Sequence, residues 1–205
     1  MNVRLKYIAA IACFIVAIAF WACTPEREVY LPVLKDAPNF TLTNQDDLEI
    51  KLSDYWDKVV VMDFIYTSCP DVCGEMNSHM KSVWEKLDSD LRQDLVLISI
   101  SFDQEFDTIA ILKQYAAIYN VPGWQFLTGT EEQIIQVTDD YDIFYERAGG
   151  NHGDLQDHEH VDGRSFNHTS ALVIIDQEGK IRKTYADPDL PDNQVTRELE
   201  YLLKQ

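Results

Sequence analysis

Basic residues are scarce in this chain of 205 residues. Lys and Arg together number 17 against 35 Asp and Glu, which gives a formal net charge of −18. This balance argues against nucleic-acid binding, because phosphate contacts require a basic patch that releases many counterions. It also argues against purely electrostatic adhesion to anionic lipid. Since 46% of the residues are apolar, the chain is not disordered throughout, and we expect a domain with its own hydrophobic core.

Cysteine and long apolar runs are also in short supply. The four cysteines are too few for a disulfide scaffold, so their positions carry more information than their number. Residues 8–22 form an apolar run of 15 residues, whereas a membrane-spanning helix needs about 20. Because Arg4 and Lys6 precede it, the run is typical of the core of a signal peptide.

The apolar run ends at Ala22 and Cys23. A small residue before Cys at this place resembles a bacterial lipobox, which implies removal of residues 1–22 and lipidation of Cys23. The alternative is an uncleaved membrane anchor. Both interpretations predict a bacterial cell-envelope protein, tethered to the lipid membrane, with its domain on the outer, periplasmic side of the inner membrane. We expect residues 23–37 to form a linker and residues 38–205 to form the folded domain.

The rest of the sequence alternates between strand and helix patterns. Continuous β-rich apolar runs predict buried strands at 58–66, 95–101 and 170–176. The last run leads through a turn into a further strand at 181–185, which predicts a hairpin. The polar, Gly- and His-rich stretch 146–165 predicts a loop. Apolar residues at helical spacing predict helices at residues 72–87, 108–119, 131–141 and 193–204.

This order of elements predicts an α/β fold with a mixed central sheet flanked by helices on both faces. A Cys-Pro loop between a buried strand and a helix, followed late in the chain by a hairpin, is the thioredoxin-like plan. Met76 and Met80 are expected in the core. Asp103 is expected to cap a loop, and Asp107 to cap the helix that starts at Thr108.

Cys69 and Cys73 lie at the start of a predicted helix, four residues apart, so both face the same side of it. The positive end of the helix dipole depresses thiol pKa values there and favours thiolates. The pair is able to form a disulfide, act as a redox pair or bind a soft ion such as Cu(I) or Zn. Its C-x-x-x-C spacing suits a bound soft ion better than fast dithiol exchange.

A metal site needs a further ligand, because two thiolates are too few for a closed zinc site or a cluster. The chain offers five histidines: His79, His152, His158, His160 and His168. We favour His168, because it precedes a strong strand, and in thioredoxin-like folds that loop packs against the cysteine loop. Two thiolates and one imidazole suit copper. The stretch from His152 to His160 is a second candidate for metal capture, although its glycines and acids also suit an exposed loop.

Four motifs, in order along the chain, resemble those of the Sco/SenC family. They are residues 63–73, residues 101–108, residues 124–129, and His168 ahead of residues 174–179. The resemblance implies a membrane-tethered, thioredoxin-like copper protein. It implies that Cys69, Cys73 and His168 are the copper ligands, and that Cys69–Cys73 is the disulfide of the oxidised form. The sequence departs from the family pattern at Gly74, where Pro is frequent, and at Asn167, where Asp is frequent.

The resemblance also implies a function and its partners. The chain is then a metallochaperone that binds copper and assists assembly of the dinuclear copper centre of cytochrome c oxidase. Its expected partners are the copper-bearing subunit of the oxidase and other copper chaperones. The alternative is a membrane-tethered thiol–disulfide oxidoreductase that reduces the oxidase cysteines, with Cys69 and Cys73 as the catalytic pair. A peroxiredoxin-like peroxidase is a third reading, favoured by Thr67 but weakened because the nearest Arg in sequence is Arg92.

Overall fold

The computed structural model describes residues 29–69, 72–148, 165–186 and 190–205. The chain divides into two compact units, residues 1–30 and 31–205, and all strands and helices named below belong to the second. None of the helices in these described ranges combines the length and apolarity that crossing a membrane requires. Cys23 and the stretch from His152 to His160 lie outside the described residues, so lipidation and metal capture there stay predictions.

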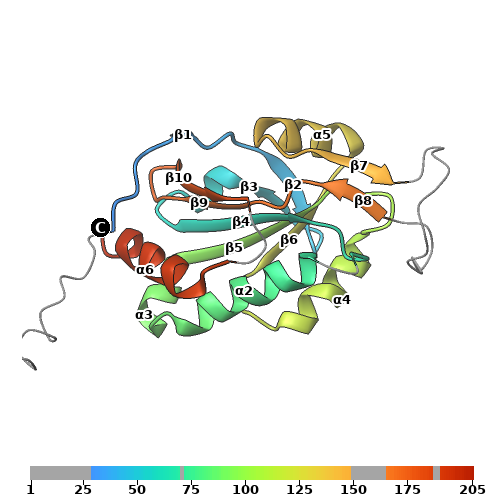
Figure 1. Cartoon of the computed structure of the whole chain (residues 1–205). Helices are drawn as coiled ribbons and strands as arrows, with labels where there is room; N and C mark the ends of the chain where they lie inside the picture. Colours follow the sequence, from blue (N-terminus) through green and yellow to red (C-terminus); the bar gives the residue numbers. More distant parts are fainter. Residues whose placement is uncertain (1–28, 70–71, 149–164, 187–189) are drawn as a thin grey trace, which may run out of the picture. The chain divides into compact units, whose positions relative to one another are not determined.

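An eight-stranded mixed sheet runs through the unit 31–205, in the order β1-β10-β9-β4-β5-β6-β2-β3 (Figure 1). Strands β4, β5 and β6 are parallel, and the other neighbours in this sheet pair antiparallel. The strands are β1 (Lys35–Asp36), β2 (Thr41–Asn44), β3 (Glu49–Lys51), β4 (Val59–Ile65), β5 (Leu95–Ser101), β6 (Gln125–Thr128), β9 (Leu172–Ile175) and β10 (Lys180–Tyr185).

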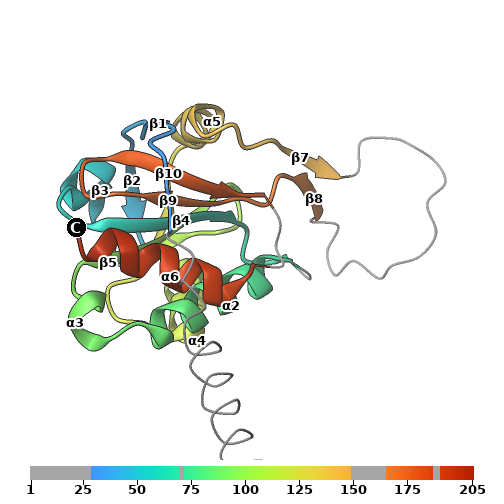
Figure 2. The same cartoon turned by 60° about the vertical axis from the view of Figure 1, so that its left-hand side comes forward.

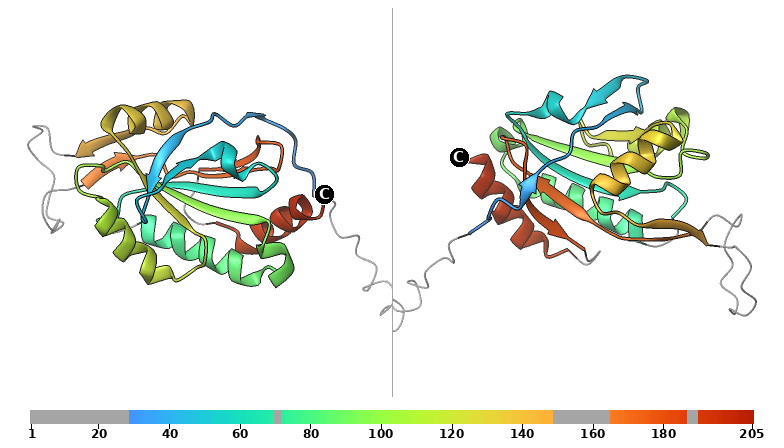
Figure 3. Two further views of the ribbon diagram at one scale, coloured as in Figure 1. Left: turned by 180° about the vertical axis from the view of Figure 1, so that it is seen from behind. Right: turned by 90° about the horizontal axis from the view of Figure 1, so that it is seen from above.

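Helices cover both faces of this sheet, which confirms the predicted α/β architecture. Helices α2, α3, α4 and α6 lie on one face and α5 on the other (Figures 1 and 2), and Figure 3 shows the same division from behind and from above. The helices are the 3-10 helix η1 (Leu52–Tyr55), α2 (Val72–Lys86), α3 (Ser89–Arg92), α4 (Ile109–Tyr119), α5 (Glu131–Asp140) and α6 (Asp192–Leu203).

Strand β4 is the centre of the sheet because its residues suit burial on both faces. All seven of its side chains are buried. Six of them, including three successive valines, are apolar and either β-branched or long enough to pack against helices on either side. Its parallel partner β5 is buried at six of seven positions. The continuous apolar runs in the sequence therefore located both strands to within one residue of their ends.

The predicted loop 146–165 was wrong at both of its ends. Strands β7 (Tyr145–Ala148) and β8 (Ser165–His168) pair antiparallel and form a separate two-stranded sheet. Each strand has only four residues with a polar composition, and they are far apart in sequence, so no local pattern announced the pairing. This small sheet lies at the end of the large sheet where β4 ends and α2 begins (Figures 1 and 2).

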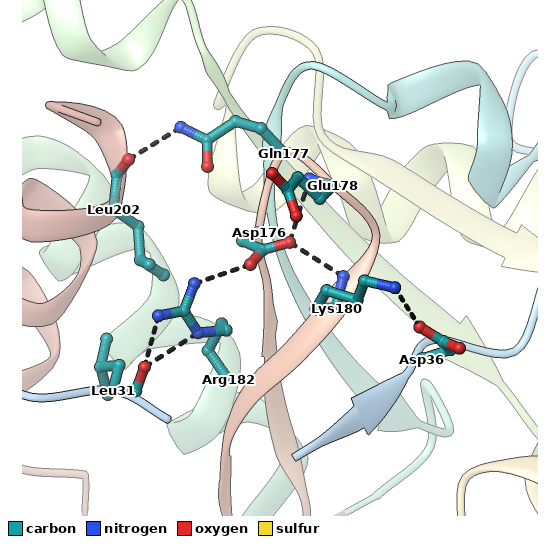
Figure 4. Close-up of polar contacts among 8 residues, drawn as sticks. All are labelled: Leu31, Asp36, Asp176, Gln177, Glu178, Lys180, Arg182 and Leu202. Atoms are coloured by element: carbon teal, nitrogen blue, oxygen red, sulfur yellow. Dashed lines mark hydrogen bonds and ion pairs between the residues drawn. The ribbon is translucent and has the colours of Figure 1, made fainter. Parts of the chain in front are cut away.

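Residues 31–37, expected as part of a linker, lie along the sheet edge. Strand β1 pairs with β10, and Lys180 binds Asp36. Arg182 donates from Nη1 to Asp176 Oδ2 at 2.7 Å and from Nε to the carbonyl oxygen of Leu31 at 2.9 Å (Figure 4). Leu31 is itself buried, so the chain already packs against the sheet at this residue.

A buried polar cluster joins the large sheet to α2, the helix that contains Cys73. Asp63 on β4 accepts a hydrogen bond at Oδ2 from Nδ2 of Asn77 on α2, at 3.0 Å. Asn77 also donates to Ser99 on β5 and accepts from Tyr115 on α4. Complete burial raises the pKa of Asp63 to about 7. Asp63 is therefore a carboxyl group that titrates near neutral pH inside the core.

We expect Asp63 to make the folded state less stable as the pH rises. Its pKa in the folded state, about 7, lies above the ordinary value of 3.8, so between these values the folded protein holds a proton that the unfolded chain has lost. The stability from protonated Asp63 is complete below about pH 4 and is lost as the pH rises through about 7, at up to roughly 1.4 kcal/mol per pH unit.

Urea unfolding of the reduced protein at a series of pH values, for wild type and Asp63→Asn, measures this effect. The amide of Asn does not titrate. As the pH rises from about 4 to about 7, the free energy of unfolding should therefore fall more in the wild type than in Asp63→Asn. Parallel pH profiles for the two proteins would mean that another group titrates.

Candidate metal centre

Three side chains from two distant parts of the chain meet at the end of the large sheet. The candidate ligand atoms of Cys69, Cys73 and His168 all lie within 4.8 Å of one another. Cys69 follows β4, Cys73 lies in the first turn of α2, and His168 is the last residue of β8. Cys73 is buried, whereas Cys69 and His168 are half-buried. These three residues are the metal ligands predicted from the sequence, and the structure brings them together.

The topology explains why the three meet. Strand β9 runs antiparallel to β4, and Leu172 at its start lies opposite Asp63 near the end of β4. His168 stands four residues before Leu172 in the chain, and Cys69 six residues after Asp63. Cys69 and His168 therefore lie beyond the same end of the sheet, next to two neighbouring strands.

Asp107 holds the loop that carries Cys69. Its carboxylate accepts hydrogen bonds from the backbone N–H of Thr67 at 2.8 Å, from the Thr67 hydroxyl, and from the Ser101 hydroxyl at 2.5 Å. Asp107 is fully buried. The prediction that it caps the following helix was wrong: Thr108 is the N-cap of α4 and accepts from the N–H of Ile111. Asp107 thus links Thr67, in the loop that carries Cys69, to Ser101 at the end of β5.

Aromatic side chains surround His168. Its ring centroid lies 5.7 Å from that of Tyr66 and 5.2 Å from that of Phe102. Nδ1 lies 3.3 Å from the carbonyl oxygen of Thr169, and a carbonyl only accepts, so Nδ1 carries the proton in this contact. That tautomer leaves the lone pair of Nε2 available to a ligand. Tyr66 and Phe102 lie within the motifs 63–73 and 101–108, but no sequence pattern indicated that they would flank the histidine.

Cys69 is the hydrogen-bonding centre of the site. A hydrogen bond with Cys69, followed by burial, raises the pKa of Cys73. A hydrogen bond with Cys69 also raises the pKa of His168. Burial, and to a smaller extent a hydrogen bond with Cys69, raises the pKa of Tyr66. The expectation that the helix dipole depresses the pKa of both thiols was wrong for Cys73, because the hydrogen bond and burial outweigh the dipole.

The other candidate residues lie elsewhere. His79 Nδ1 is 2.6 Å from Asp192 Oδ1, in the contact between α2 and α6. Met76 and Met80 are buried in the core, as expected. Asn167, at a position where the sequence departs from the family pattern, is exposed. Of the histidines in the described residues, His168 is the one that the structure brings to the cysteines.

Chemically, the arrangement offers two thiols and one imidazole at close range. Such a donor set suits a soft ion with low coordination number. Cys69 and Cys73 are both in the thiol form here. Their sulfur atoms lie within 4.8 Å of each other, and a disulfide bond needs them about 2.05 Å apart, so a local shift that closes this gap would let the pair oxidise. The site is therefore equipped for metal binding and for two-electron redox chemistry.

Comparison with known proteins adds independent findings. The sequence model described as SCO1/SenC matches residues 34–204. A SCO2-like protein of Rickettsia conorii is 30% identical over 168 residues, which cover 79% of this chain and 78% of the relative.

Two solved structures have the same thioredoxin-like fold, as predicted. ScoI of Bradyrhizobium japonicum with copper bound matches with a TM-score of 0.68 at 22% identity, covering 82% of this chain and 99% of that one. BsSco, described as a member of the Sco family of cytochrome c oxidase assembly proteins with a disulfide switch, matches with a TM-score of 0.65 at 25% identity, covering 85% and 98%.

We expect Cys69 to react with alkylating reagents before Cys73. Cys73 is only 3% exposed and its thiol pKa is raised, so at neutral pH it is both inaccessible and protonated, and the thiolate is the reactive form. The reduced protein is treated with less than one equivalent of iodoacetamide. Both cysteines fall in one tryptic peptide, between Lys58 and Lys81, so fragment-ion mass spectrometry assigns the label. Equal labelling of Cys69 and Cys73 would contradict the expected difference in reactivity. In the Cys69→Ser variant, Cys73 should be alkylated slowly.

Proposed function

The chain belongs to the SCO1/SenC family, and we propose that it is a copper-binding protein that delivers copper during the assembly of cytochrome c oxidase. The observation that carries this proposal is the convergence of Cys69, Cys73 and His168, whose ligand atoms lie within 4.8 Å of one another. Cys69 and Cys73 share one segment, whereas His168 comes from another about 100 residues later, so the meeting of the imidazole with the thiols is a property of the fold and not of local sequence.

The donor chemistry supports copper as the cargo. Thiolate sulfur and imidazole nitrogen are ligands that copper prefers, and two thiolates with one imidazole give a soft site. Ligand thiols must lose their protons to bind a metal, and the positive charge of the ion stabilises the thiolates in this buried place. The Nδ1–H of His168 points at the Thr169 carbonyl, which would hold the ring with Nε2 toward the metal.

Names of the similar proteins support the same proposal. One structural neighbour is a ScoI with copper bound, and another belongs to a group of cytochrome c oxidase assembly proteins. By this proposal the recipient is the copper-bearing subunit of the oxidase, and other copper chaperones are the donors. The leader sequence supports attachment to the outer side of the inner membrane, with Cys23 as the lipidated residue.

A thiol–disulfide oxidoreductase is the second candidate. It is favoured by the hydrogen bond between Cys69 and Cys73 and by the disulfide switch described for BsSco. In this reaction the more accessible Cys69 attacks a target disulfide and one target thiolate leaves. Cys73 then displaces the second target sulfur. Two electrons and two protons pass to the target, and Cys69–Cys73 becomes a disulfide.

Copper binding by the full chain in detergent tests the proposal. Cys13→Ser and Cys23→Ser are introduced into every protein compared, so that the remaining cysteines are those of the site. We expect one copper per chain under reducing, anaerobic conditions. Removing any one ligand, by Cys69→Ala, Cys73→Ala or His168→Ala, should weaken binding by roughly 100-fold or more, since even outer-shell changes cost 10- to 100-fold.

His79→Ala is the matched control, because His79 pairs with Asp192 away from the cysteines, and it should bind copper like the wild type. A wild-type chain that binds no copper but whose Cys69–Cys73 disulfide exchanges readily would overturn the copper proposal in favour of the oxidoreductase. His168→Ala separates the two further, because it should leave disulfide exchange largely intact.

A further inference from the structure

His168 is carried by a structural unit different from the one that carries the cysteines. The two-stranded sheet β7–β8 ends in His168, whereas Cys69 and Cys73 belong to the β4–α2 segment of the large sheet. In the register of β7 and β8, Tyr145 lies opposite His168, and Arg147 lies opposite Phe166. The position of the histidine over the cysteines therefore depends on how the two-stranded sheet is held against the large one.

Aromatic packing forms the first part of that contact. The Phe166 ring lies 5.0 Å from Tyr66 and 5.4 Å from Phe102, in edge-to-face geometry. Tyr145 stacks on Phe102 at 5.1 Å. Phe102 therefore touches both strands of the small sheet as well as His168. This packing holds the small sheet against the large one, but aromatic pairs are favourable over centroid distances of about 4.5–7 Å and so do not define a single position.

Arg147 adds a directional contact. Its Nη2 lies 3.4 Å from Oδ1 of Asp103 and 2.8 Å from Oε2 of Glu105. Its guanidinium carbon lies 5.3 Å from the Phe166 ring centroid. The residue thus spans from the small sheet to the loop after β5, and covers the aromatic ring that packs between them.

The two carboxylates differ in what they contribute. Glu105 is 74% exposed, so water and salt screen its pair with Arg147. The Asp103 side chain is 1% exposed, and breaking a pair with a buried charge costs far more than breaking one at the surface. Asp103 follows directly after Phe102, the residue against which His168 packs. The pair with Asp103 therefore ties the small sheet to the wall of the site.

We infer that Arg147 is a positioning residue for the copper site. Through its contacts with Asp103 and Phe166 it holds the β7–β8 sheet against the large sheet, in the position that places His168 over the cysteines. This inference rests on the proposed function for its copper readout. Arg147 touches none of the three candidate ligands in the contacts described above, so we expect its effect on copper binding to pass through His168.

Copper affinity of the full chain in detergent tests this, again with Cys13→Ser and Cys23→Ser throughout. Arg147→Met keeps the length of the side chain and removes its charge and fork. It should weaken copper binding by roughly tenfold, the lower end of effects seen for residues that orient a ligand. Arg147→Lys restores the charge without the planar fork and should recover part of the loss. Asp103→Asn should reproduce the Arg147→Met effect.

The decisive comparison is with His168→Ala. If Arg147 acts only by placing His168, Arg147→Met combined with His168→Ala should bind copper as weakly as His168→Ala alone. A further tenfold loss in the double variant would overturn the inference, as would wild-type affinity in Arg147→Met. Arg92→Met is the matched control: its guanidinium lies 4.3 Å over Trp84, so the same chemical change occurs at a different contact, and copper affinity should not change.

A copper-free measurement separates this inference from the proposed function. Amide hydrogen exchange in residues 145–148 and 165–168 should be faster in Arg147→Met than in Arg92→Met, because the contacts of Arg147 hold those strands. Unchanged exchange in these strands would overturn the inference whether or not the protein binds copper. If exchange accelerates but the wild-type chain binds no copper, the proposed function fails while the role of Arg147 in holding the small sheet stands.

Discussion

The complete burial of β4 is the constraint on which the site depends. Because β4 is buried on both faces, it must have paired strands on both edges, and these are β5 and β9. The parallel partner β5 ends beside the end of β4, with Ser101 opposite Ile65. The antiparallel partner β9 begins there. Three chain segments therefore meet at the same end of these strands. They are the cysteine loop after β4, the loop after β5 that contains Asp107, and the connection from His168 into β9.

The two halves of the site are held in different ways. The cysteine half is bound by buried groups: Asp107 accepts from Thr67 and Ser101 with no exposure to water, and Cys73 is buried in the first turn of α2. The histidine half rests on rings and on Arg147, which is 47% exposed. A buried carboxylate that accepts three hydrogen bonds resists opening more than an ion pair whose guanidinium is half exposed. The structure thus joins a rigid dithiol to a more separable imidazole.

Sequence alone reached the parts of this arrangement that local pattern determines. The apolar runs located β4 and β5, and the cysteine pair with His168 was found from residue type, spacing and resemblance to the Sco/SenC motifs. It did not reach the β7–β8 sheet, whose pairing joins distant short segments, nor the link through Asp107, which looked like an ordinary helix cap. It also gave the wrong direction for the Cys73 pKa, because burial and a sulfur partner are tertiary facts.

For a protein proposed to pass copper on, this division has a consequence. Release of an ion requires that one ligand leave before the others, since losing all three together would expose bare copper to solvent. The imidazole is the ligand whose support is weakest, and it is attached to a sheet separate from that of the thiols. A recipient ligand could then take the place of His168 while Cys69 and Cys73 still hold the ion. On this reasoning the order of ligand exchange follows from how each side chain is anchored, and not from the strength of its bond to the metal.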